Sequence, residues 1–136
     1  MRRIQFLAIA LAFILLNVNC SSKSAKSNAT ESIAKADKVE VFYFHFNRRC
    51  ATCNAVEEVS KLAIAETYDD KVSFESCNLD EKEGKEKGNN LGVSAQTLLI
   101  VSGDTKINIT SQAFMNARSN PEKLKALIKE KIDPLL

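Results

Sequence analysis

Two cysteines separated by two residues, Cys50 and Cys53, are the side chains of this sequence best suited to do chemistry. They lie between an apolar run, Val39–Phe46, and a helical pattern that begins near Ala51. A thiol in the first turn of a helix is close to unpaired backbone N–H groups and to the positive end of the helix dipole, which favour its thiolate form. Because the thiolate is the form that attacks disulfides, the position of this pair predicts thiol–disulfide exchange.

Three neighbouring residues bear on the reactivity of the pair. Arg48 and Arg49 directly precede the pair and add positive charge that favours a thiolate. They are predicted either to recognise an acidic partner surface or to belong to a solvated loop that acts on Cys50 only through its charge. His45 is predicted either to tune the thiol or to be an ordinary packed strand residue. A permanent structural disulfide is the other interpretation of the pair, but so small a ring restrains the unfolded chain very little.

Zinc binding is the competing chemistry. Cys50 and Cys53 would supply two thiolate ligands, and His45 and Cys77 would complete a set of four. His45 and Cys77 are lone residues on different predicted strands, however, whereas zinc sites usually take their second pair of ligands from another close doublet. We therefore expect a redox-active disulfide without a bound cofactor, with zinc as the alternative. We expect Cys77 to be a small buried core residue, with a second disulfide or a regulatory thiol as alternatives.

The first residues of the chain predict export. Arg2 and Arg3 precede an apolar stretch over residues 4–18, which is shorter than the roughly twenty residues that span a bilayer. A short apolar segment behind basic residues is typical of a secretory signal peptide. We predict a signal peptide over residues 1–19.

Cys20 follows the apolar stretch in a pattern that resembles the lipobox of bacterial lipoproteins. The resemblance implies that Cys20 is lipidated and that the domain lies on the periplasmic side of a bacterial membrane, held there by its lipid. Asn17 occupies the place where lipoproteins usually have a leucine, so an uncleaved anchor and simple secretion are the alternatives. All three place the domain outside the cytoplasm, where disulfides persist.

Charge gives no indication of a nucleic-acid partner. Removing Arg2 and Arg3 from the 19 basic residues leaves 17, which equals the 17 acidic residues of the chain. A neutral domain without a long basic run lacks the usual features of a nucleic-acid-binding surface. The expected partners are a protein thiol or disulfide in the cell envelope and, through the lipid, the membrane.

The exported part divides into a tether and a domain. Residues 20–37 are rich in serine, alanine and lysine, with Ile33 as their only large apolar residue, and so predict a flexible tether. Residues 38–136 are enough for one small domain with a single core.

Hydrophobic periodicity over residues 38–136 predicts alternating strands and helices. The expected elements are a strand over 38–46, a helix over 51–68, a strand over 72–79, a short exposed helix capped by Asp80 and ending near Gly88, a hairpin of strands 97–101 and 106–110, and a helix that is capped by Asn120, starts at Pro121 and is ended by Pro134. This order predicts an α/β fold, in which a four-stranded mixed sheet has helices on both faces.

The arrangement resembles the thioredoxin fold over roughly residues 38–132. Three local matches carry the resemblance: the pair Cys50 and Cys53 after the first strand, the segment Asn78–Asp80, and the segment Gly92–Leu98 before the third strand. The stretch Phe44–Cys53 is also similar to a bacterial thioredoxin-like family known as nitrophenyl-compound nitroreductase subunits. The thioredoxin resemblance implies a thiol–disulfide oxidoreductase in which Cys50 attacks and Cys53 resolves the mixed disulfide.

The resemblance also implies a substrate-docking segment, Ala95, Gln96 and Thr97, where thioredoxins bring a cis-proline against their cysteines. Gln96 stands at the proline position, so a trans peptide is expected there, because a non-proline cis bond costs about 2.5–4 kcal/mol. Phe44 replaces the buried acid of thioredoxins, which removes a proton acceptor for Cys53. These departures favour the alternative function, a non-catalytic binding or metal-holding subunit of an envelope complex.

Overall fold

The computed structural model describes residues 38–136, so the predicted signal peptide, Cys20 and the tether lie outside the described residues. Its elements are β1 (Val39–His45), α2 (Ala51–Tyr68), the 3-10 turn η2 (Asp69–Lys71), β2 (Val72–Asn78), α3 (Lys82–Leu91), β3 (Thr97–Ser102), β4 (Thr105–Asn108), α4 (Thr110–Asn116), α5 (Pro121–Ile132) and the 3-10 turn η3 (Asp133–Leu135). Within this described part, no helix combines the length and apolarity needed to cross a membrane.

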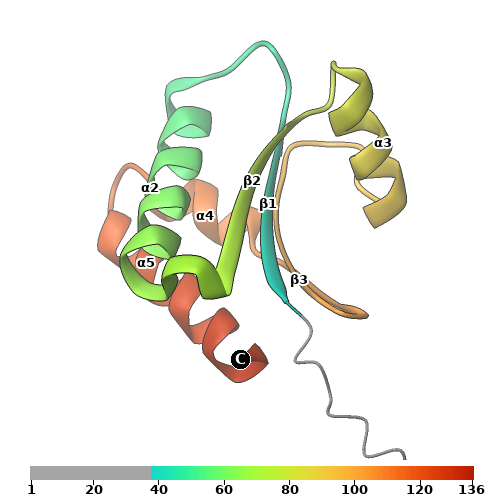
Figure 1. The fold of residues 1–136 in the computed structure, drawn as a ribbon. Helices are drawn as coiled ribbons and strands as arrows, with labels where there is room; N and C mark the ends of the chain where they lie inside the picture. Colours follow the sequence, from blue (N-terminus) through green and yellow to red (C-terminus); the bar gives the residue numbers. More distant parts are fainter. Residues whose placement is uncertain (1–37) are drawn as a thin grey trace, which may run out of the picture. The chain divides into compact units, whose positions relative to one another are not determined.

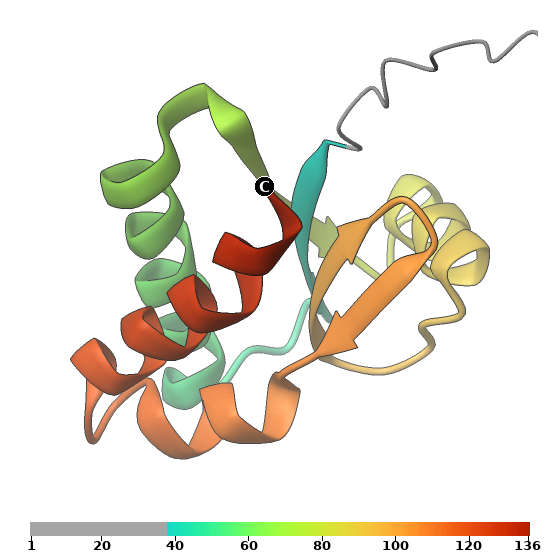
Figure 2. The same ribbon diagram turned by 90° about the horizontal axis from the view of Figure 1, so that it is seen from below.

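The four strands form one mixed sheet in the order β2-β1-β3-β4. β1 is parallel to β2 and antiparallel to β3, and β3 and β4 form an antiparallel hairpin. Figure 1 shows α2 and α5 on one side of the sheet and α3 on the other, and Figure 2 shows the same layers from below. The predicted four-stranded sheet with helices on both faces is confirmed.

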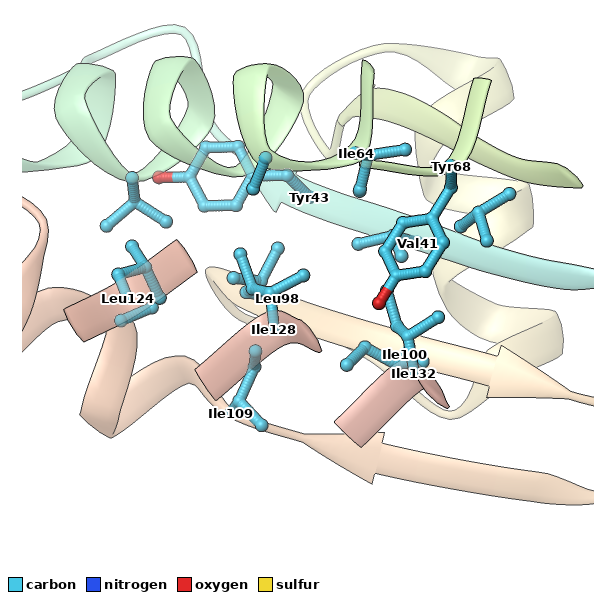
Figure 3. Close-up of a cluster of buried hydrophobic side chains, with 14 of the residues drawn as sticks. Val41, Tyr43, Ile64, Tyr68, Leu98, Ile100, Ile109, Leu124, Ile128 and Ile132 are labelled. Atoms are coloured by element: carbon cyan, nitrogen blue, oxygen red, sulfur yellow. The ribbon is translucent and has the colours of Figure 1, made fainter. Parts of the chain in front are cut away.

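β1 is apolar almost throughout because both of its faces are covered. Val41 and Tyr43 point into the layer beneath α2 and α5, whereas Phe42 and Phe44 point into the layer beneath α3. Figure 3 shows the first of these layers, in which the labelled side chains are Val41, Tyr43, Ile64, Tyr68, Leu98, Ile100, Ile109, Leu124, Ile128 and Ile132. A strand buried on both faces cannot alternate apolar and polar residues, which explains its continuous pattern.

The last long helix, α5, begins and packs as its sequence predicts. Asn120 precedes it, and its side chain accepts a hydrogen bond from the Lys123 N–H at 3.2 Å. Proline follows in the first helical position, where no hydrogen-bond donor is needed. The buried stripe of this helix consists of Leu124, Ile128 and Ile132.

The helix α3 differs from its prediction at both ends. It runs past Gly88 to Leu91, and its C-cap is Gly92 in the left-handed region at φ 75°. Asp80 does not cap it: the N-cap is Glu81, without a side-chain cap bond. Gly92 suits a left-handed C-cap because it has no Cβ. The helix therefore ends at this glycine, about one turn after Gly88, where the sequence predicted its end.

The glycines within α3 serve close packing and do not end the helix. A Cβ on Gly84 would lie 2.1 Å from the backbone oxygen of Asn78, and one on Gly88 would lie 2.7 Å from that of Val93. Both glycines are buried, so the helix is less exposed than predicted. The absence of a side chain lets α3 approach the end of β2 at Gly84 and lets the turn at Val93 pack against the helix at Gly88.

The second corrected element is the end of the hairpin. The alternation of residues 106–110 predicted a strand through Thr110, but β4 ends at Asn108 and the unpredicted helix α4 starts at Thr110. The Asn108 side chain accepts hydrogen bonds from the Thr110 N–H at 3.0 Å and hydroxyl at 2.6 Å. This local turn competes with strand pairing, and it directs Ile109 into the core.

Replacing Gly84 by alanine should destabilise the domain by about 1–3 kcal/mol, because the added methyl group meets the Asn78 backbone, which cannot move aside. This loss should exceed the gain in helix propensity, which is at most about 1 kcal/mol. Urea unfolding would measure it. The exposed neighbour Lys85→Ala is the control and should change stability little. A Gly84→Ala variant as stable as the control would contradict this account of α3.

Candidate active site

A disulfide joins Cys50 and Cys53 at the N-terminus of α2. Cys50 is the N-cap residue and is exposed, whereas Cys53, in the first turn, is only 5% exposed. The Cys53 N–H donates to the Cys50 sulfur at 3.1 Å, and the Cys50 N–H donates to the Cys53 sulfur at 3.0 Å. The two cysteines thus form a capping box in which sulfur takes the place of the usual side-chain oxygen.

The capping geometry favours a reactive sulfur at Cys50. An N-cap atom accepts a hydrogen bond from a helix N–H that has no partner within the helix. A thiolate at this position would accept a charge-assisted bond from the Cys53 N–H and would face the positive end of the helix dipole. The geometry therefore supports the feature predicted from the spacing, a sulfur whose anionic form is stabilised by α2.

The loop that carries Cys50 is anchored to the turn between β2 and α3. The Asn47 N–H donates to the Asp80 carboxylate at 2.7 Å, and the Asn78 amide donates to the Asn47 side-chain oxygen at 2.7 Å. The Leu79 N–H donates to the His45 carbonyl at 2.7 Å. Asp80, which the sequence suggested as a helix cap, thus holds the active-site loop, and sequence reasoning missed this role because the contact joins distant segments.

Behind the disulfide, Tyr43 and Gln96 form a hydrogen-bonded chain with Cys53. The Tyr43 hydroxyl donates to the Cys53 carbonyl oxygen at 3.0 Å, and the Gln96 amide donates to that hydroxyl at 2.6 Å. The Gln96 side-chain oxygen lies 3.8 Å from the Cys53 sulfur. Sequence analysis missed Tyr43, since a tyrosine within an apolar strand has the pattern of an ordinary core residue.

Burial governs the ionisation of Tyr43. It raises the pKa of the phenol above its usual value, although the Gln96 hydrogen bond and the charge of Arg49 act in the opposite direction. Tyr43 has no exposed surface. The hydroxyl therefore remains a neutral hydrogen-bonding group over the physiological pH range.

The two arginines before the pair have different surroundings. Arg49 donates to Glu57 on α2, and its guanidinium carbon lies 5.8 Å from the centre of the Tyr43 ring. Burial raises the pKa of Glu57, but hydrogen bonds from Ser76 and Arg49 outweigh it and hold that pKa below its usual value. Arg49 is thus paired with a carboxylate, which offsets the positive charge predicted to act on the sulfurs. Arg48 is exposed.

His45 and Cys77, the other two candidate zinc ligands, lie on opposite faces of the sheet. The His45 ring packs beside Tyr43, with ring centres 5.9 Å apart, whereas Cys77 belongs to the apolar layer with Phe42 and Phe44. Across residues 38–136, no group of three or more histidine, cysteine or acidic side chains is placed to hold a metal. The structure does not bring the alternative ligand set together.

Cys77 is the buried core residue that the sequence predicted. It is a free thiol, 4% exposed, and its sulfur donates to the Glu75 carboxylate at 3.4 Å. Burial, followed by the charge of Glu75, raises the pKa of Cys77 to about 12. A thiol with these properties is a poor nucleophile near neutral pH.

The segment Ala95, Gln96 and Thr97 reaches the disulfide through the turn after α3. Every peptide bond within residues 38–136 is trans, including the one before Gln96. Ala95 is exposed, Thr97 is buried, and the Thr97 hydroxyl donates to the Ala95 carbonyl at 2.9 Å. Of the predicted docking residues, Gln96 brings its side-chain oxygen to 3.8 Å from the Cys53 sulfur.

Comparison with known proteins supports the fold. No protein-family model matches the chain, and no curated protein matches it. Thioredoxin O2 from Arabidopsis thaliana, in its oxidised state, is 24% identical with a TM-score of 0.50, covering 69% of this chain and 75% of that one. Chlamydomonas reinhardtii thioredoxin f2 is 25% identical with a TM-score of 0.46, covering 70% and 80%.

The similarity to thioredoxin O2, the strand order and the arrangement of helices define a thioredoxin-like α/β fold. Its Cys-x-x-Cys pair lies within disulfide distance at the N-terminus of the first helix after the central strand. A redox-active disulfide needs no further cofactor to exchange electrons with thiols.

After reduction of the disulfide, a thiol reagent near neutral pH should label Cys50 first and should leave Cys77 unlabelled until the protein unfolds. Cys77 is buried, and because its pKa is about 12, its reactive thiolate forms only as the pH rises toward that value. Peptide mapping by mass spectrometry, with and without denaturant, would measure the order of labelling. Labelling of Cys77 as fast as Cys50 in the folded protein would contradict the placement of both residues.

Proposed function

We propose that this protein is a thiol–disulfide oxidoreductase of the bacterial cell envelope that acts on protein disulfides or thiols. One observation carries the proposal: an exposed sulfur at a helix N-cap is bonded to a buried sulfur in the first turn, within a thioredoxin-like fold. The exposed sulfur of Cys50 is accessible to a partner, and the buried sulfur of Cys53 is close enough to displace that partner.

In the reducing direction, the Cys50 thiolate attacks one sulfur of a partner disulfide and forms a mixed disulfide, and the other partner sulfur leaves as a thiolate. Cys53 then loses its proton and attacks the Cys50 sulfur. The Cys50–Cys53 disulfide forms, and the second partner sulfur leaves as a thiolate. Two electrons pass from the cysteine pair to the partner. In the oxidising direction a partner dithiol reverses these steps.

The loop and the segment beside the pair support a protein partner. Arg48 lies two residues before Cys50, and Ala95 directly precedes Gln96, whose side chain lies beside the Cys53 sulfur. Both residues are exposed, so both are available to an approaching chain. We assign Ala95, Gln96 and Thr97 to the docking of the partner and Arg48 to the recognition of acidic groups on it. His45, which packs against Tyr43, is at most an indirect influence on the pair.

The N-terminal pattern supports the cellular location. Basic residues, a short apolar stretch and Cys20 favour export and a lipid anchor, and an exported domain meets conditions in which a disulfide partner persists. The partner is then a thiol or disulfide protein of the envelope, and the membrane is reached through the lipid on Cys20.

A second candidate function, a thioredoxin-like binding subunit of an envelope complex with weak exchange activity, is favoured by one observation. Phe44 is buried in the layer beneath α3, at the position where thioredoxins have a proton-accepting acid. Nitroreduction is not part of the proposal, since it rested only on the similarity of the segment Phe44–Cys53 to a family.

A Cys53→Ser variant should accumulate mixed disulfides with envelope proteins through Cys50, because the residue that resolves them is absent. Non-reducing gels, compared with gels of the same samples after reduction, would show these adducts. The matched control is Cys50→Ser, in which Cys53 is retained but is buried, and it should trap few partners. If the two variants trap the same amount, Cys50 is not the attacking residue and the proposed exchange is wrong.

Radiolabelled fatty acid should be incorporated into the wild-type protein in bacterial cells and lost in a Cys20→Ala variant, since Cys20 is the proposed lipidation site. Autoradiography of the immunoprecipitated protein would measure the label. Cys77→Ala is the control and should keep it. A wild-type protein without label would refute the lipid anchor while leaving the exchange chemistry unaffected.

A further inference from the structure

Gln96 is the residue of the site whose side chain has a function that partner docking does not explain. It is only partly exposed, its amide nitrogen donates to the Tyr43 hydroxyl, and its amide oxygen lies 3.8 Å from the Cys53 sulfur. A side chain held in this way is oriented toward the cysteine pair, so it has a role beyond the docking of a partner.

The orientation of the Gln96 amide follows from the groups behind it. The Cys53 carbonyl oxygen can only accept a hydrogen bond, so the Tyr43 hydroxyl, 3.0 Å away, must donate to it. The hydroxyl then has only acceptor capacity left, and it must receive its second bond from the Gln96 NH₂ group at 2.6 Å. The remaining end of the amide, its oxygen, therefore faces the Cys53 sulfur at 3.8 Å.

An acceptor oxygen at this position distinguishes the states of Cys53. In the disulfide the sulfur carries no proton and makes no hydrogen bond to the oxygen. When the disulfide is opened and Cys53 takes up a proton, its S–H can donate to the Gln96 oxygen. A thiolate in the same place would face a partial negative charge. The Gln96 oxygen thus favours the protonated thiol of Cys53 and opposes the Cys50 N–H, which donates to the same sulfur at 3.0 Å, whereas the helix N-cap favours the thiolate of Cys50.

Resting on the exchange activity proposed above, we propose that Gln96 accepts a hydrogen bond from the reduced Cys53 thiol and thereby prolongs the mixed disulfide between Cys50 and a protein partner. Tyr43 acts as the positioning residue that holds the amide of Gln96 in the required orientation. Cys53 must lose its proton before it attacks the Cys50 sulfur, so a group that stabilises the thiol slows this step.

The surroundings supply no strong base that would remove the proton. Gln96 is neutral, and burial raises the pKa of the Tyr43 phenol. The charged and titratable groups around Tyr43 are Arg49, Glu57 and His45; Arg49 and Glu57 pair with each other, and the ring nitrogen Nδ1 of His45 lies 3.1 Å from the Phe46 carbonyl. Within residues 38–136, the polar groups at hydrogen-bonding distance from the Cys53 sulfur are the Cys50 N–H and the Gln96 oxygen, and neither is a base that would take its proton.

The test measures the alkylation of Cys53 as a function of pH in reduced protein that carries Cys50→Ser, so that no partner and no exchange are involved. Adding Gln96→Met, which keeps the length of the side chain but removes the acceptor, should shift the midpoint of the pH profile to lower pH. A weak S–H···O bond is lost, so the thiolate fraction near neutral pH should rise roughly two- to five-fold. Tyr43→Phe should shift the profile in the same direction because it frees the amide.

The matched control is Gln112→Met on α4, an exposed glutamine away from the pair, which should leave the profile unchanged. A substitution that merely opened the site would raise the alkylation rate at high pH without moving the midpoint. With both cysteines present, Gln96→Met should also speed the release of glutathione after reduced protein is mixed with excess glutathione disulfide, because Cys53 then resolves the adduct faster.

An unchanged midpoint in Gln96→Met, or a shift to higher pH, would overturn this role of Gln96. That outcome is separable from failure of the proposed function, which is judged by trapping through Cys50 in the Cys53→Ser variant. Trapping without a midpoint shift refutes the role of Gln96 alone. A midpoint shift without trapping supports the hydrogen bond and refutes exchange with envelope proteins.

Discussion

The burial of β1 on both faces is the constraint on which the rest of the structure depends. Its successive side chains enter two separate apolar layers, so helices must cover both sides of the sheet, and two strands must pair with its edges. Tyr43 is part of the same strand, and its hydroxyl lies at the end of one layer, directly behind the cysteines. The residue that helps to build the core therefore also supports the redox site.

Close approach between backbones fixes the site from the other side of the sheet. Gly84 lets α3 pack against the end of β2, and Gly88 lets the turn at Val93 pack against the helix before the chain returns toward the cysteines. The same corner supplies Asp80, which holds the loop before Cys50. The helix α3 contributes no reactive group, yet its position determines where Gln96 and the active-site loop lie.

The site replaces an ionisable proton acceptor with neutral polar groups. Phe44 fills the place where a buried acid was expected, while the Tyr43 hydroxyl and the Gln96 amide form the polar surroundings of Cys53. A neutral chain of hydrogen bonds orients the sulfur but does not accept its proton. Under the proposed function, the lack of a proton acceptor favours long-lived mixed disulfides over fast turnover. A complete cysteine pair is therefore compatible with Phe44 and Gln96, the two departures from thioredoxins that suggested a binding subunit.

The sequence alone determined the four strand segments, the helices that begin at Ala51 and Pro121, the burial of Cys77 and the position of the cysteine pair, because local periodicity, capping and spacing carry that information. It mispredicted the end of α3 and missed α4, where glycine packing and a side-chain turn outweighed the local pattern. Only the tertiary structure decided that Tyr43 and Gln96 meet at Cys53 and that His45 and Cys77 lie on opposite faces. Such contacts join residues far apart in the chain, and they depend on strand register and helix placement, which no local segment of the sequence encodes.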